Sequence, residues 1–201
     1  MQGSLRILFG ILVVALAVGG CAGKTVTRVD SDTTIDLSGR WNDTDSRLVA
    51  EEMILSAMNE NWYTDWMQGH GNKPTVIVGT VRNQTTEHIA TATFIGDIER
   101  AFVNSGRVRV VATAQERGEI RDERVDQGRY ASDETIKQFG REQGADFMLI
   151  GNLSSINDSE DGKEVRFYQT DLTLVNIETN EKTWMGQKKI KKYVGRGKYR
   201  P

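Results

Sequence analysis

The sequence contains one cysteine, two prolines and two histidines among its 201 residues. A single cysteine excludes an intrachain disulfide and a zinc site built on several thiolates. Two prolines exclude a collagen-like repeat or a proline-rich spacer. The formal charge of -2 gives no general reason to expect nucleic acid as a partner. With 38% hydrophobic and 27% charged residues, the composition is typical of one folded domain.

The first twenty-one residues are built differently from the rest. Arg6 is the only charged side chain before Lys24, and an unbroken apolar run covers residues 7–18. Such a run rises only about 18 Å as a helix, against roughly 30 Å for a bilayer core. Small residues then lead directly to Cys21, an order that resembles the lipobox of bacterial lipoproteins. We expect cleavage before Cys21 and lipidation of its thiol. There are two alternatives: an uncleaved membrane anchor, or an ordinary signal peptide that leaves Cys21 as a free thiol.

The chain divides by composition into four segments. Residues 1–20 are the expected signal peptide, and residues 21–40 are a Thr-, Asp- and Ser-rich tether without apolar periodicity. Residues 41–193 form the globular body, and residues 194–201 are a basic tail. Two or three acyl chains hold a protein firmly to a bilayer. Ala22, in place of the aspartate associated with inner-membrane retention, favours the periplasmic face of the outer membrane.

The body alternates between helical and strand patterns. A helix is expected from Asn42 or Asp43 to about residue 60, and its predicted buried face consists of Leu48, Val49, Met53, Leu55 and Met58. Further helices are expected over residues 88–104, from a capping box at residues 113–116, and from residue 132. Strands are expected at 75–81, 108–111, 147–156, 165–177 (with a change of face midway) and 183–193, and a polar loop at 157–163. This order predicts a single α/β domain with a mixed β-sheet flanked by helices.

The sequence offers no set of residues for catalysis. His70 lies between two glycines and His88 follows Glu87, so neither belongs to a metal-binding or nucleophile–base pattern. No phosphate-binding glycine loop is present. We therefore expect a protein that is not an enzyme and that has no cofactor, no metal and no small-molecule substrate.

Tryptophans and lysines suggest surfaces for partners. Trp62 and Trp66 are four residues apart, so a continued helix would place both indoles on one face. Such a pair serves either core packing or the binding of a partner or sugar. From Lys182 onward there are eight basic residues and no acidic one. This basic segment either binds an anionic partner or protects an exposed edge strand against aggregation.

Four stretches of the body, residues 36–52, 83–89, 104–110 and 144–151, resemble the LpoB family of penicillin-binding protein activators. The resemblance implies a domain similar to the amino-terminal domain of TolB, carried by an outer-membrane lipoprotein in the periplasm. It also implies that the protein binds a bifunctional (class A) penicillin-binding protein and raises its peptidoglycan synthesis. The hypothetical contact residues are those whose polarity packing does not explain: Arg40, Asn42, Asp43, Arg82, Asn83, Thr85 and Glu87. Capping is the alternative role, above all for Asn42, Asp43 and Thr85.

One feature departs from the family pattern. Its best-known members carry a long, proline-rich segment before the folded part, whereas the tether here has about twenty residues and no proline. The alternative hypothesis is therefore an envelope scaffold that uses a TolB-like domain to bind other proteins without activating a synthase.

Overall fold

The computed structural model describes residues 25–31, 33–132, 134–135 and 142–195. The chain divides into two units, residues 1–33 and residues 34–201. Cys21, the expected signal segment, most of the helix expected from residue 132, and all but the first two residues of the basic tail lie outside the described residues. Within the described ranges, no helix has both the length and the apolar character needed to cross a bilayer.

Five strands form one mixed sheet in the order β2-β1-β3-β4-β5. The strands are β1 (Thr75–Asn83), β2 (Arg109–Val110), β3 (Phe147–Glu160), β4 (Lys163–Asn176) and β5 (Lys182–Gly195). β1 pairs in parallel with β2 and β3, whereas β3, β4 and β5 are antiparallel neighbours. The prediction of an α/β domain with a mixed sheet is confirmed. The more specific similarity to TolB stays a prediction.

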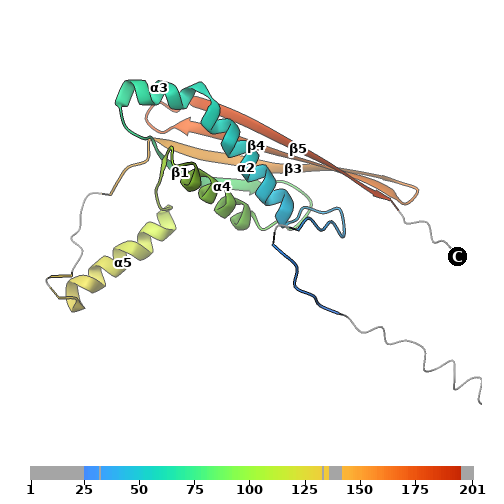
Figure 1. Cartoon of the computed structure of the whole chain (residues 1–201), viewed down its shortest axis with the longest axis horizontal. Coiled ribbons are helices and arrows are strands. Elements are labelled where there is room, and N and C mark those ends of the chain that lie inside the picture. The colour runs from blue at the N-terminus through green and yellow to red at the C-terminus, as the bar shows by residue number, and fades with distance from the viewer. Residues whose placement is uncertain (1–24, 32, 133, 136–141, 196–201) are drawn as a thin grey trace, which may run out of the picture. The chain divides into compact units, whose positions relative to one another are not determined.

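The prediction of a polar loop at 157–163 is wrong, because β3 and β4 extend into this range. Only Asp161 and Gly162 form the turn, and both have positive φ, 50° and 75°. Two such residues form the tight turn whose twist matches that of the flanking strands. The resulting β3–β4 hairpin projects beyond the helices (Figure 1).

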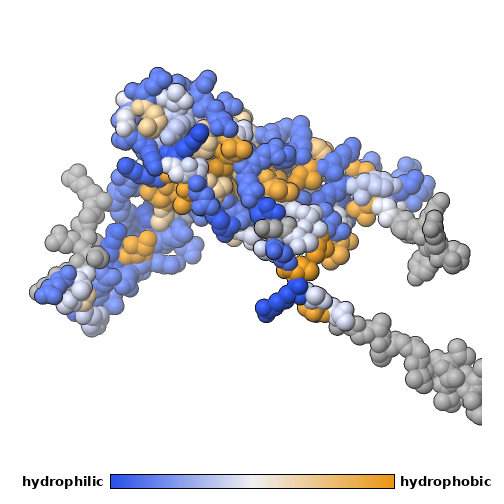
Figure 2. Space-filling view, viewed as in Figure 1, coloured by the Kyte–Doolittle hydropathy of each residue, from blue (hydrophilic) through white to orange (hydrophobic). Residues whose placement is uncertain are grey.

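The helices are α2 (Asp43–Asn59), α3 (Asn61–His70), α4 (Thr91–Ser105) and α5 (Ala114–Tyr130). Asn42 caps α2 and Thr113 caps α5, each in a reciprocal capping box with the third helical residue. Gly106 ends α4 in a left-handed conformation with φ of 65°. α5 has no buried residue, and its surface is largely hydrophilic (Figure 2).

The core lies between the sheet and the helices α2 and α4. Phe94, Ile98 and Phe102 of α4 are fully buried, as the helical spacing predicts. In α2 the expected Val49, Met53 and Met58 are buried, but Leu48 and Leu55 are exposed. The prediction for these two leucines is wrong because Ala50, Ile54 and Ala57 complete the buried stripe of α2 instead.

The helices that the structure describes cover one face of the sheet. Tyr168, Thr170, Leu172 and Leu174 alternate along β4 and are all buried on the helix side. Because the pairing of β3 with β4 is continuous, the change of face expected within β4 does not occur. The opposite face is more open, with Ile150, Ile156 and Met185 exposed. We call this second surface the open face.

Candidate functional site

Glu87 is the centre of a partly buried hydrogen-bond network. Its side chain is only 12% exposed and follows β1 in the loop that leads to α4. The hydroxyl of Tyr168 donates to its Oε1 at 2.7 Å, and the backbone N–H of Trp41 donates to its Oε2 at 3.3 Å. Arg166 contacts the same carboxylate at 3.5 Å. Glu87 thus ties the residue that precedes the α2 cap to the centre of β4.

Tyr168 and Arg166, whose side chains contact the Glu87 carboxylate, each form a hydrogen bond with a carboxylate. Burial, followed by the hydrogen bond to Glu87, raises the pKa of the Tyr168 hydroxyl, so the phenol stays protonated and acts as a donor. Arg166 makes a two-pronged contact with Glu164 at 2.7 and 3.0 Å. This hydrogen bond holds the pKa of Glu164 below its usual value. The arrangement is a positioning network without a nucleophile.

Lys192 of β5 is the centre of a second cluster at the start of α2. Its ammonium donates to Asp36 at 2.7 Å, to Asp45 at 2.6 Å and to the carbonyl of Arg40 at 3.2 Å. Burial opposes the charge of Lys192, but the hydrogen bonds to Asp36 and Asp45 raise its pKa overall. The hydrogen bond from Lys192 in turn lowers the pKa of Asp36.

These contacts fix the end of the segment expected to be a tether. Asn42 donates from its amide to Asp36 at 2.7 Å, and Gly39 adopts φ of 66° directly against Val194 of β5. Residues 36–40 therefore lie on the folded domain, in agreement with a second unit that begins at Thr34. The tether that precedes this unit is therefore shorter than the expected residues 21–40 and ends at Thr33.

The seven predicted contact residues fall into two groups. Asn42, Asn83, Thr85 and Glu87 already serve local structure. Asn83 Oδ1 accepts from the backbone and hydroxyl of Thr85 at 2.9 and 2.7 Å, and Asn83 Nδ2 donates to the Glu87 carbonyl at 2.8 Å. Their polarity is explained by capping and loop formation. A role in partner binding stays a prediction for all of them.

Arg40, Asp43 and Arg82 form the second group, whose side chains are exposed. Arg40 and Asp43 lie beside the Lys192 cluster, at the amino-terminal end of α2. Arg82 lies apart from them on the open face, in register with Asn152 of β3 and, beyond it, Asp171 of β4. Asp171 accepts hydrogen bonds from Gln169 and Gln187, both at 2.8 Å. Arg82 itself forms no hydrogen bond or ion pair through its side chain with a residue that the structure describes.

Sequence patterns did not reveal several members of the two clusters. Tyr168 and Arg166 occur in an alternating strand, and Lys192 is one of five lysines in β5. Nothing local reveals the clusters, because the bonds of Tyr168 and Arg166 to Glu87 and of Lys192 to Asp45 join residues more than seventy positions apart. Among the described residues, no group of three histidine, cysteine or carboxylate side chains could hold a metal ion.

Solved structures similar to the chain have low sequence identity to it. The LpoB carboxy-terminal domain of Salmonella enterica is 15% identical over 64% of this chain and 91% of that one, with a TM-score of 0.35. LpoB of Escherichia coli is 15% identical over 86% of both chains, with a TM-score of 0.39. A lipoprotein of Neisseria meningitidis is 14% identical over 60% and 83%, with a TM-score of 0.37. No curated protein matches the chain.

The family model provides the decisive comparison. The model described as the peptidoglycan-synthase activator LpoB matches residues 45–190. This range runs from the first turn of α2 into β5, and so includes β1 to β4, α3 to α5, and Glu87, Arg166 and Tyr168 of the network. Because the match covers more than half of its length, the chain belongs to the LpoB family of peptidoglycan-synthase activators.

Proposed function

We propose that the protein is a non-enzymatic lipoprotein that binds and activates a bifunctional class A penicillin-binding protein. The observation that carries this proposal is the family match over residues 45–190. We further propose that lipid on Cys21 anchors the protein in the outer membrane, facing the periplasm. The short apolar run and the small residues before Cys21 support this location.

The open face of the sheet is the surface we propose for the synthase. It exposes Ile150, Ile156 and Met185, which provide apolar area for an interface. Lys189 and Lys191 of β5 are exposed on the same face, in addition to Arg82. A partner surface with apolar residues and carboxylates would complement this combination.

Activation by a protein without catalytic groups requires differential binding. The protein must bind the active conformation of the synthase more tightly than the inactive one, and the population shift cannot exceed that difference in affinity. A preformed sheet suits this role because its backbone needs little ordering upon binding.

The test is reconstitution of the purified protein with a candidate class A synthase and lipid-linked precursor, with glycan polymerisation as the readout. We expect faster polymerisation with the native protein and a weaker stimulation with Arg82→Glu. Arg129→Glu, at an exposed position in the last turn of α5, is the matched control and should stimulate normally. Unchanged stimulation by Arg82→Glu would remove the open face from the proposal.

A scaffold without activating effect is the second candidate, and the tether favours it. The thirteen residues from Cys21 to Thr33 reach at most about 45 Å and contain no proline. Binding of the synthase without any change in rate would support the scaffold. Product formed in the absence of synthase would contradict both proposals, since it would require catalysis by the protein itself.

The anchor is tested separately by intact-mass spectrometry of the protein purified from membranes. We expect a chain that begins at Cys21 and carries the mass of acyl groups. A Cys21→Ser variant should retain the first twenty residues and lack that mass. An unmodified amino terminus in the native protein would contradict the proposed location.

A further inference from the structure

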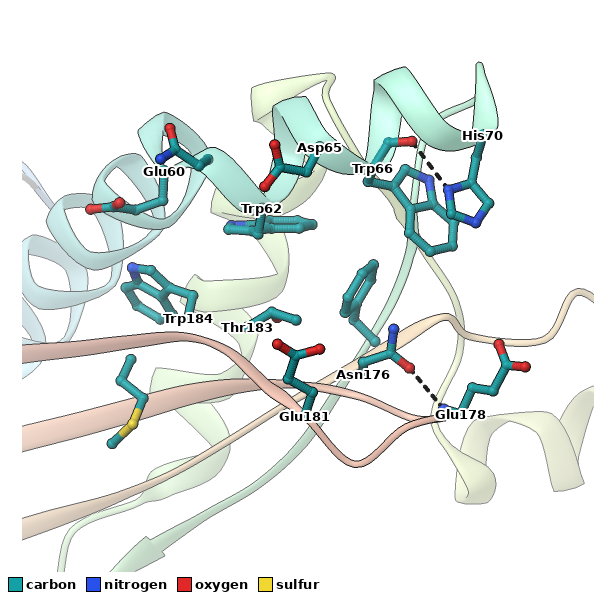
Figure 3. A pocket seen from close by; sticks show the side chains of 13 residues that line it. Glu60, Trp62, Asp65, Trp66, His70, Asn176, Glu178, Glu181, Thr183 and Trp184 are labelled. Atoms are coloured by element: carbon teal, nitrogen blue, oxygen red, sulfur yellow. Dashed lines mark hydrogen bonds between the residues drawn. The ribbon is translucent and has the colours of Figure 1, made fainter.

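A groove of about 720 Å³ lies between α3 and the turn that joins β4 to β5 (Figure 3). Its aromatic lining consists of Trp62, Trp66, Phe147 and Trp184, so three of the four tryptophans of the chain meet here. Trp62 and Trp66 contact Phe147 edge-on, with ring centres 5.2 and 5.0 Å from it. None of the seven predicted contact residues lines this groove.

The α3 wall of the groove is held in place by hydrogen bonds from both indoles. Trp62 donates to the carbonyl of Ala57 at 2.7 Å, and Trp66 donates to the carbonyl of Asn72 at 3.0 Å. His70 stacks on Trp66 with ring centres 3.7 Å apart and an angle of 9° between the planes. These contacts fix the side of α3 that faces the groove.

The opposite wall is a preformed turn. Asn176 accepts from the backbone N–H groups of Glu178 and Thr179 at 2.9 and 3.0 Å. Its own N–H donates to the carbonyl of Glu181 at 2.8 Å, and Asn180 adopts φ of 62°. With both walls held in this way, little ordering is needed when a ligand enters.

The rim of the groove is acidic. Glu60 and Asp65 line it from the α3 side, and Glu178 and Glu181 line it from the turn, whereas no lysine or arginine among the described residues lines it. In Figure 3 the Glu181 carboxylate points from the turn toward α3. All four acidic residues are exposed, and none forms an ion pair with a residue that the structure describes. The groove therefore carries about four uncompensated negative charges at neutral pH.

The aromatic lining and the carboxylates without ion-pair partners favour a positively charged ligand over a neutral one. A neutral sugar would displace water from the carboxylates without neutralising them. A lysine or arginine side chain neutralises them, packs its methylene groups on the partly exposed ring of Trp66, and is attracted to that ring. Trp62, Phe147 and Trp184 are buried and support Trp66 from the core. Arginine in addition offers a planar group that can bind a carboxylate through two hydrogen bonds.

We propose that this groove binds a positively charged, extended segment of a partner protein through lysine or arginine side chains. The groove shares Met185 with the open face, but its walls come from α3 and the β4–β5 turn, and the proposal does not depend on the proposed synthase activation. It would give the protein a second interaction surface, recognised by charge complementarity and aromatic contact.

The experiment follows the indole N–H signals of the full chain, ¹⁵N-labelled and in nonionic detergent, by NMR. The probe is a short, end-blocked peptide of alternating arginine and glycine, and glutamate replaces arginine in the control peptide. We expect shifts of the Trp62, Trp66 and Trp184 signals with the arginine peptide only. The Trp41 signal should stay in place, because Trp41 does not line the groove.

Two double variants test whether the groove itself binds the peptide. Asp65→Asn with Glu181→Gln removes two rim charges with little change of shape, and should weaken binding at least about tenfold, which is about 1.4 kcal/mol. Asp122→Asn with Asp126→Asn removes the same charge from exposed positions of α5 and should leave binding unchanged. Raised salt should weaken binding to the native groove.

Three results would overturn the proposal. The first is equal weakening by both double variants, which would indicate nonspecific attraction to an acidic protein. The second is the absence of any indole shift with the arginine peptide. The third is a shift of the same indole signals by a chitin oligosaccharide but not by the peptide, which would make the groove a sugar site.

Discussion

Glu87 is one of the predicted contact residues, but the structure gives it a role in stability. Replacing Glu87 with alanine distinguishes these two roles. In Glu87→Ala, the Tyr168 hydroxyl loses its acceptor while it stays fully buried. An unsatisfied buried hydroxyl costs about 1–3 kcal/mol, and the lost bonds to a charged group contribute about 1.5–3 kcal/mol. Arg166 keeps Glu164, and the Trp41 N–H keeps the Tyr168 oxygen at 3.1 Å. We therefore expect a loss of about 3–5 kcal/mol in the free energy of unfolding.

The assay is urea unfolding followed by tryptophan fluorescence, together with a thermal scan. For a domain of this size the expected loss lowers the melting temperature by about 6–20 °C. Glu119→Ala, at an exposed position of α5, is the control and should change stability by less than about 0.5 kcal/mol. In a double-mutant cycle, Tyr168→Phe should recover part of the loss, because it removes the orphaned hydroxyl.

Unchanged stability combined with lost binding or stimulation would refute the structural role of Glu87. If Glu87→Ala unfolded at the native urea concentration but no longer stimulated or bound the synthase, Glu87 would be a contact residue. The partly buried network would then contribute nothing measurable to stability, despite its short hydrogen bonds.

Two further predictions concern the Lys192 cluster and the indole of α3. Lys192→Met should destabilise the domain by about 2 kcal/mol at neutral pH. Because Lys192 lowers the pKa of Asp36, the native protein gains stability above the ordinary value of 3.8 and loses it as the pH falls. Urea unfolding at neutral and acidic pH should show a smaller acid-dependent loss in the variant, and an equal loss in both proteins would contradict the linkage. Trp62→Phe removes the buried bond to the Ala57 carbonyl and should cost about 1–3 kcal/mol by the same measurement. An unchanged stability would mean that the carbonyl finds another donor.

The local signals in the sequence were sufficient for most helices and strands. The capping boxes at Asn42 and Thr113 set the starts of α2 and α5, because each uses residues only three positions apart. The strand expected at 75–81 corresponds to β1, and the helix expected over 88–104 corresponds to α4. Leu48 and Leu55 were misassigned because hydrophobicity alone does not distinguish two apolar sides of the same helix.

The amino-acid sequence alone determined the α/β class, the expected lipidation motif and the family resemblance, since each depends on residues that are close together in the chain. Only the tertiary structure decided that Glu87 serves a partly buried network while Arg82 remains exposed, because this distinction depends on strands far apart in sequence. The same holds for the aromatic groove. Its walls come from α3 and the β4–β5 turn, which lie more than one hundred residues apart, and sheet pairing brings them together.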